Sequence, residues 1–198
     1  MSAYYKIFIC LSFVFWLLPD LSYSQKDINE EKAEEKYANI MQSIYSGQLD
    51  SAYLQSKDLL SFSKNTGLKK YEGIAISRFA EIKLQAFDYD SAIYFFQSAE
   101  EIFETLQEDL WQGRMNVGIG YIMRVLDENE KAKLYYIRAT EQIKITTDTM
   151  WYGIIHNHLG NIYFKLGDYI PALKHLQISL TVFKAQNRYL DVGSTYNT

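Results

Sequence analysis

The stretch from Leu159 to Leu173, which reads LGNIYFKLGDYIPAL, contains the local signals that decide the fold. Gly167 suits the left-handed backbone that ends many helices, and Asp168 is a residue type that caps the exposed N–H groups of the following helix. Pro171 would lie in the first turn of that second helix, where its missing N–H costs little. The stretch therefore predicts one helix over about 151–166 and a second helix that begins directly after a tight turn.

The apolar residues on both sides of this turn recur at helical spacing. Ile155, Leu159, Ile162 and Leu166 lie three or four positions apart, which places them on one face of a helix. The preceding part of the chain contains a similar turn, Phe-Asp-Tyr at residues 87–89. The residues expected to form the matching apolar stripes around it are Ile74, Phe79, Ile82, Leu84, Ala92, Phe96, Ala99 and Phe103. Each unit is therefore predicted to be a helical hairpin.

Two series of small residues recur along the chain with a period of 40. They are the alanines Ala52, Ala92, Ala132 and Ala172, and the glycines Gly73, Gly113, Gly153 and Gly193. The aromatic residues Tyr71, Trp111 and Trp151 precede three of these glycines by two positions. A fixed period of about 20 to 50 residues is typical of architectures in which similar units are stacked. The sequence therefore predicts an array of stacked hairpins.

The fourth unit resembles the tetratricopeptide repeat, whose first helix carries a Leu-Gly pair and a later Tyr, and whose second helix has an early Ala. The residues that carry this resemblance are Leu159, Gly160, Tyr163, Gly167, Asp168, Tyr169, Ala172 and Leu173. Gly120 and Ala80 occupy the Gly160 position in two other units, whereas Ile40 occupies it in the first. The resemblance, to a variant longer than the usual repeat of about 34 residues, implies an all-α, right-handed α-solenoid of stacked antiparallel helical hairpins.

The repeat register divides the chain into six segments. We expect a signal peptide at 1–24, a degenerate first repeat or N-terminal cap at 25–68, complete repeats at 69–108, 109–148 and 149–188, and the start of a truncated fifth repeat at 189–198. A solenoid normally ends in a unit with a polar outer face. An unfinished repeat therefore indicates the N-terminal fragment of a longer protein.

The first 24 residues have the organisation of an export signal. A positive charge at Lys6 is followed by an apolar run over 7–18, and Ser22 and Ser24 offer small residues before a cleavage site. The run would span roughly 18 Å as a helix, short of the ~30 Å hydrocarbon core, so cleavage is favoured over a retained anchor. Cleavage would also remove Cys10, the only cysteine, and with it any disulfide or thiolate site. We expect a periplasmic or secreted protein, and a membrane anchor only in a missing C-terminal segment.

Composition and motifs argue against most catalytic and nucleic-acid functions. Lys and Arg number 20 against 24 Asp and Glu, so the net charge of -4 suits neither DNA nor RNA. The sequence has no Gly-rich phosphate loop and no HExxH motif. His156 and His158 lie two positions apart on one predicted helix and therefore point in different directions, and His175 belongs to another helix. We expect no enzyme activity, no cofactor and no metal.

The resemblance implies that ligands bind along the concave face formed by the first helix of each hairpin. The repeat register assigns to this face Arg114, Tyr121, Arg124, Asn157, Asn161 and Lys165, with Ser77, Glu81 and Gln85 in the second repeat. Asn157 and Asn161 lie one turn apart and could bond a peptide backbone, and the arginines could pair with carboxylates. The lysine of the family's carboxylate clamp is replaced by Ser77, Val117 and Asn157, which argues against capture of a terminal carboxylate. Ordinary solvated side chains are the alternative interpretation.

Two classes of function are compatible with these sequence features. The first is an exported, non-enzymatic scaffold that binds a protein or peptide in the concave groove. The alternative is the extracytoplasmic sensor region of a membrane-bound histidine kinase, DNA-binding regulator or nucleotide cyclase, whose transmembrane and output parts would lie beyond residue 198. An apolar stretch of about 20 residues after the array would favour the alternative. A starch-binding outer-membrane protein is disfavoured, because the lipid-modified cysteine of that type is missing.

Overall fold

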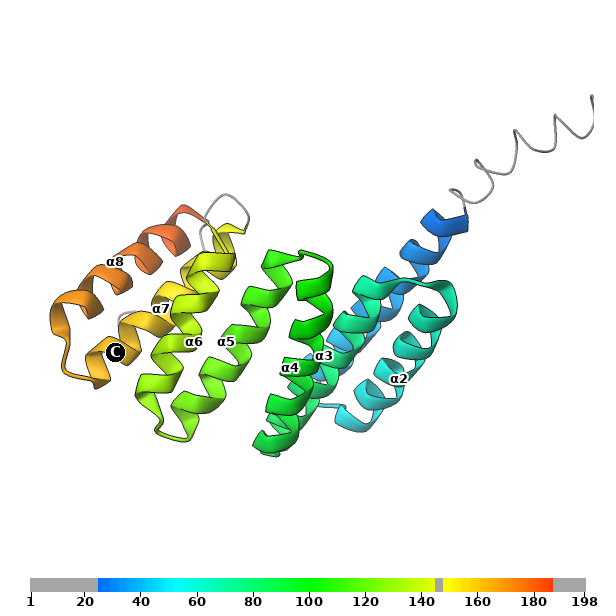
Figure 1. Ribbon diagram of the computed structural model, residues 1–198, viewed down its shortest axis with the longest axis horizontal. Helices are drawn as coiled ribbons and strands as arrows, with labels where there is room; N and C mark the ends of the chain where they lie inside the picture. Colours follow the sequence, from blue (N-terminus) through cyan, green and yellow to red (C-terminus); the bar gives the residue numbers. More distant parts are fainter. Residues whose placement is uncertain (1–24, 145–147, 187–198) are drawn as a thin grey trace, which may run out of the picture.

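The computed structural model describes residues 25–144 and 148–186, and the regular elements in these ranges are helices. The N-terminal helix is described over 25–45 and is followed by α2 (Leu49–Thr66), α3 (Lys69–Gln85), α4 (Tyr89–Thr105), α5 (Asp109–Val125), α6 (Asn129–Gln142), α7 (Thr149–Lys165) and α8 (Tyr169–Ala185). Successive helices lie side by side in antiparallel hairpins along one long axis (Figure 1). The predicted all-α solenoid of helical hairpins is confirmed.

Three of the predictions fall on residues that the structure does not describe. They are the signal peptide, the start of the fifth repeat, and Gly193 in the glycine series. Within the described ranges, no helix combines the length and the apolar character that a membrane span requires.

The helices fall into two series whose first residues lie 40 positions apart. The helices α3, α5 and α7 begin at Lys69, Asp109 and Thr149. Each of them packs against the helix that follows it, and α5 also contacts both α3 and α7. We call the N-terminal helix, α3, α5 and α7 the inner helices, and α2, α4, α6 and α8 the outer helices.

Small residues occur where inner and outer helices cross. The four alanines of the 40-residue series are at most 2% exposed. A Cβ atom added at Gly160 would lie 2.6 Å from Cγ of Leu176, and one added at Gly113 would lie 2.4 Å from Cγ1 of Ile143. Added Cβ atoms at Gly73, Gly120 and Gly153 would come within 2.8 to 2.9 Å of neighbouring side chains. A larger residue at these positions would overpack the crossing, which typically costs about 1 to 3 kcal/mol.

The turn inside each hairpin contains one residue with left-handed backbone. Gly47 and Gly167 have φ angles of 73° and 84°, as the glycine at the predicted turn requires. Phe87 and Asp127 hold the same position in the other two hairpins, with φ angles of 59° and 62°. Left-handed backbone costs a residue other than glycine roughly 1 to 2 kcal/mol. The turn is therefore imposed by the packing of the hairpin as well as by local sequence.

The predicted capping role of Asp168 is wrong. Asp168 is the N-cap residue of α8, but its side chain accepts no capping hydrogen bond. At the start of α4, by contrast, the Asp88 carboxylate accepts a hydrogen bond from the backbone N–H of Ser91 at 3.3 Å. The residue at the corresponding position of α8 is Pro171, which has no N–H to donate. The proline that suits the first turn thus removes the donor that the aspartate would need.

The core is formed by the apolar stripes that the sequence predicts. Ala92, Phe96, Ala99 and Phe103 of α4 are at most 3% exposed, and Ile155, Leu159 and Ile162 of α7 are at most 1% exposed. Leu84 and Leu166 are only partly buried at the edge of the core. The ring of Phe103 stacks on Trp111 with centroids 5.3 Å apart and an interplanar angle of 18°. This contact connects one hairpin to the next.

Candidate functional site

A pocket of about 820 Å³ lies along the inner helices, and we call it the inner pocket. All four inner helices contribute side chains to it, together with α4 and the turn before it. Aromatic rings form much of the lining: Tyr37, Tyr45, Phe87, Tyr89, Tyr121 and Trp151. A concave, mostly apolar surface with few polar groups is the usual form of a binding site.

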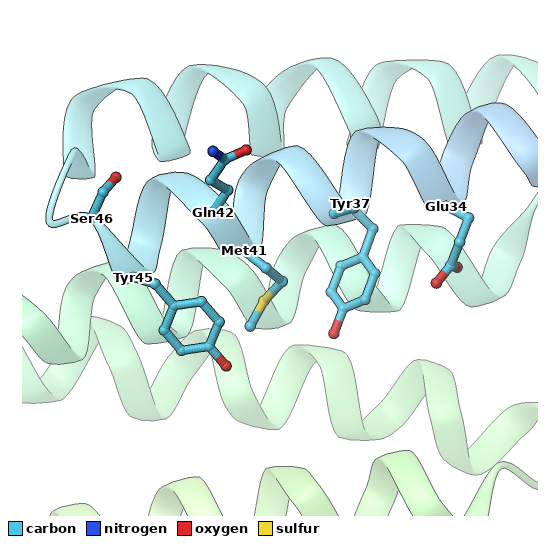
Figure 2. A pocket seen from close by; sticks show the side chains of 7 residues that line it. Glu34, Tyr37, Met41, Gln42, Tyr45 and Ser46 are labelled. Carbon is cyan, nitrogen blue, oxygen red and sulfur yellow. The ribbon is translucent and has the colours of Figure 1, made fainter.

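The N-terminal helix borders a second pocket of about 730 Å³. Tyr37, Met41 and Tyr45 line both pockets. Figure 2 shows these three side chains on one side of the N-terminal helix, whereas Gln42 points away from them. The two pockets are therefore parts of one aromatic surface.

The inner pocket runs diagonally across the inner helices. Its lining residues span 78–85 in α3, 114–121 in α5 and 150–158 in α7. Consecutive spans begin 36 residues apart, although the helices begin 40 residues apart. From α3 to α5 and from α5 to α7 the lining thus moves about one helical turn toward the helix N-terminus, whereas the lining of the N-terminal helix begins 41 residues before that of α3. A superhelical twist of the array accounts for this shift.

Arg78 and Glu81 form an ion pair at the wall of the inner pocket. Nη1 of Arg78 lies 2.9 Å from Oε2 of Glu81, and the Arg78 side chain is only 5% exposed. The same guanidinium contacts Sδ of Met41 at 2.9 Å and lies 5.5 Å from the ring centroid of Tyr37. Burial raises the pKa of the Glu81 carboxyl, while the positive charges of Arg78 and Arg114 oppose that rise. The two charges of the pair largely compensate each other.

Arg114 contacts two indole rings. Its guanidinium carbon lies 4.5 Å from the ring centroid of Trp111 and 5.0 Å from that of Trp151, within range of a cation–π interaction. Nη2 of Arg114 is 3.6 Å from Oδ2 of Asp148. Nε is buried and has no hydrogen-bond partner among the described residues. Burial lowers the pKa of Arg114, but a guanidinium stays charged in proteins.

Tyr121 and His158 line the part of the inner pocket nearest α6. The guanidinium of Arg124 lies 4.9 Å from the ring centroid of Tyr121. The ring of His158 stacks on Tyr136 with centroids 4.9 Å apart and an interplanar angle of 10°. Burial, helped by the positive charge of Arg124, lowers the pKa of His158 to about 4. His158 is therefore neutral at pH 7.

The structure brings some of the predicted groove residues together and separates others. Glu81, Gln85, Arg114 and Tyr121 line the inner pocket. The remaining predicted residues do not line it: Ser77, Arg124, Asn157, Asn161 and Lys165.

The predicted residues outside the inner pocket make contacts with other side chains. Ser77 is fully buried and donates to the backbone oxygen of Ile74. The amide of Asn161 donates to Oδ1 of Asn157 at 2.8 Å. Nζ of Lys165 lies 3.8 Å from the carboxylate of Asp127. Roles for these residues in ligand binding stay predictions.

Sequence reasoning missed Tyr37, Met41, Arg78 and Trp151 in the inner pocket. Trp151 belongs to an aromatic series that the repeat register had already identified, but only as a marker of the period. Tyr37 lies in the first unit, whose Ile40 departs from the repeat pattern. A spacing of 36 residues between α5 and α7, in place of the 40 of the repeat, would have identified the lining residues of α7.

The structure also corrects the interpretation of the histidines. His156 and His175 belong to different helices, but their Nδ1 atoms meet at 2.7 Å between α7 and α8. Two ring nitrogens alone make an incomplete metal site. Among the described residues, no group of three or more His, Cys, Asp or Glu side chains could hold a metal ion.

Comparisons with known proteins give matches in structure and none in sequence. No protein-family model matches the chain, and no curated protein matches it. Fifty-six chains of solved structures match. One is BtubC (BKLC) from P. vanneervenii, with 17% identity, a TM-score of 0.65, and coverage of 80% of this chain and 66% of that one. Another is aspartyl phosphate phosphatase F from Bacillus subtilis, with 19% identity, a TM-score of 0.76, and coverage of 84% and 44%.

The fold and the inner pocket define the class of protein as a helical-repeat α-solenoid. The solved structures it resembles are helical-repeat proteins, and at identities below 20% they show the fold alone. The chain spans about two thirds and less than half of the lengths of these two neighbours. A tetratricopeptide-like repeat fits this fold, and membership of that family stays a prediction.

Proposed function

We propose that this chain is a non-enzymatic, tetratricopeptide-like scaffold that binds a protein or a peptide in the inner pocket. The observation that carries the proposal is a pocket lined by side chains of all four inner helices and rich in aromatic rings. Tyr and Trp side chains are enriched in protein interfaces because they bury a large area at a small entropic cost. The solved structures that share the fold support a scaffold at the level of fold analogy.

The titratable groups of the inner pocket support binding more than catalysis. Glu81 is committed to its ion pair with Arg78, and His158 is stacked on Tyr136. A general acid or base must be able to reach a substrate proton. Neither group has the freedom that this role requires. The proposal therefore includes no cofactor, metal or nucleic acid.

Removing single pocket tyrosines should weaken the binding of peptides selected from a random library on the full chain. We expect Tyr121→Ala and Tyr45→Ala each to lower affinity about tenfold, because aromatic residues supply most of the energy at such surfaces. Peptide affinity is measured by fluorescence anisotropy with labelled peptides. The matched control is Tyr94→Ala, which removes an exposed tyrosine that lines neither pocket. Equal loss in all three variants, or a library without binders, would contradict the proposal.

We also propose that the protein is exported and that residues 1–24 direct the export. The proposal is supported by the charged, apolar and small-residue segments of this stretch. In a bacterial host, we expect the chain in the extracytoplasmic fraction with a new N-terminus near Gln25, detected by mass spectrometry. A charge in the apolar run, Val14→Arg, should retain the uncleaved chain inside the cell, whereas Ser2→Arg should not. An uncleaved wild-type chain in the cytoplasm would refute export.

The second candidate is an extracytoplasmic sensor region of a membrane-bound regulator. Such a region would use the same inner pocket to detect its ligand. The gene sequence after residue 198 separates the two candidates: an apolar stretch of about 20 residues followed by an output module favours the sensor.

A further inference from the structure

The residues that line the inner pocket include more cationic than anionic side chains. Among them are two arginines, Arg78 and Arg114, and one acidic residue, Glu81. Arg78 and Glu81 are paired at 2.9 Å. His158 adds no charge because its pKa is about 4. Arg114 is thus the cation that a ligand would meet.

Arg114 is already oriented for binding. Its guanidinium carbon lies 4.5 and 5.0 Å from the ring centroids of Trp111 and Trp151, and these two cation–π contacts restrict the side chain. A planar guanidinium fixed in this way loses little entropy when it forms hydrogen bonds with an anion. The ordering that a flexible side chain would undergo on binding is thus complete before the ligand arrives.

The nearest carboxylate of the chain competes only weakly for Arg114. Oδ2 of Asp148 lies 3.6 Å from Nη2, which is longer than a hydrogen bond. The other carboxylate oxygen, Oδ1, accepts the capping hydrogen bond from the backbone N–H of Trp151 at 3.0 Å. Nε of Arg114 is buried and without a partner among the described residues. The Arg114 side chain is 21% exposed, so a ligand carboxylate would be bound by its Nη groups and not by the buried Nε.

The surroundings of Arg114 fit an internal segment of a peptide. The pocket lining continues on both sides of α5, toward Tyr37 and Tyr45 on the N-terminal helix and toward Ile154 on α7. A bound, extended peptide can therefore continue beyond Arg114 at both of its ends. The aromatic rings beside Arg114 suit a large apolar side chain next to the anionic one.

Resting on the proposed function, we propose that the inner pocket binds an internal acidic residue of an extended peptide flanked by large apolar side chains. Arg114 would hold the Asp or Glu carboxylate by charge-assisted hydrogen bonds, which are stronger and shorter than neutral ones. The tyrosines of the N-terminal helix and Tyr121 would cover the neighbouring apolar side chains. Charge complementarity and the unused donors of Arg114 support an acidic peptide over a basic one.

Two pools of synthetic peptides test this inference on the full chain. Both pools are N-acetylated and C-amidated, with a central Glu or a central Gln between randomised Phe, Tyr, Leu and Met positions. We expect the Glu pool to bind at least tenfold more tightly in fluorescence anisotropy, and this preference to shrink at high salt. Equal binding of the two pools would overturn the inference. Because this comparison uses the unmodified chain, its result does not depend on whether a variant folds.

Variants then assign the preference to Arg114. We expect Arg114→Gln to reduce the preference for Glu to less than twofold, and Arg114→Lys to reduce it at least threefold because the planar fork is lost. Arg138→Gln, on α6 and outside the lining of both pockets, should leave the preference intact. Thermal melting of each variant shows whether it is folded. A full preference in a folded Arg114→Gln variant would overturn the role of Arg114.

The remaining outcomes separate this inference from the proposed function. If peptides with a free C-terminal carboxylate bind more tightly than the capped Glu pool, the internal acidic residue is wrong while peptide binding stands. If random-library peptides bind but the Glu and Gln pools bind alike, the acidic specificity is wrong and the scaffold stands. If no peptide binds at all, both proposals fail.

Discussion

Alanine in place of Phe103 should destabilise the fold by about 3 to 5 kcal/mol, the usual cost of removing a buried aromatic ring. Phe103 is fully buried and stacks on Trp111 of the following hairpin. A Cβ atom added at Gly73 would lie 2.8 Å from the Phe103 ring, so the ring also fills the contact between α3 and α4. Few neighbours can collapse into the space it leaves. Urea unfolding followed by circular dichroism measures the loss.

The loss at Phe103 is large compared with the total stability of about 5 to 15 kcal/mol that is typical of a folded protein. The matched control is Phe164→Ala in α7, whose side chain is 47% exposed. We expect this control to cost less than about 1 kcal/mol. In a stacked array each hairpin is stabilised mainly by its neighbours. Similar losses in the two variants would show that the contact between α4 and α5 does not hold the hairpins together.

The hairpins could be predicted because their signals are local and repeated. The small residues at the crossings, such as Ala92 and Gly160, leave no space for longer side chains, so the packing itself enforces the pattern. Apolar stripes such as Ile155 and Leu159 then define the buried face. The cap at Asp168 is the exception. The backbone N–H that the aspartate would bind belongs to position 171, and this position is a proline, which has no N–H.

The inner pocket could be predicted only in part, because its position depends on the twist of the whole array. The repeat register assigns Glu81, Arg114 and Tyr121 to the concave face, and all three line the inner pocket. In α7 the lining lies about one turn nearer the helix start than in α5, so Trp151 and His158 enter the pocket and Asn161 does not. A twist that accumulates over several repeats is a property of packing geometry, and a single repeat in the sequence contains no measure of it.

Acidification should destabilise the hairpin of α7 and α8, because two of its histidines are held neutral. Burial lowers the pKa of His156 and of His158 from 6.5 to about 4, with smaller contributions from His175 and Arg124 respectively. The unfolded chain binds these protons near pH 6.5 and the folded chain does not. Stability is therefore complete above about pH 6.5 and decreases as the pH falls toward 4. The shift at His158 alone corresponds to about 3 kcal/mol over this range.

Substituting one histidine separates this effect from the titration of the carboxylates, because the carboxylates titrate in the same way in the variant and in the wild type. At pH 7, His158→Asn should be less stable than the wild type because the stacking on Tyr136 is lost. Between pH 7 and pH 4.5 that difference should shrink by about 2 to 3 kcal/mol, since asparagine takes up no proton in the unfolded chain. Urea unfolding of both proteins at several pH values measures the difference. A difference that stays constant with pH would mean that His158 has the same pKa in the folded and in the unfolded chain, and the buried, neutral ring on Tyr136 would be wrong.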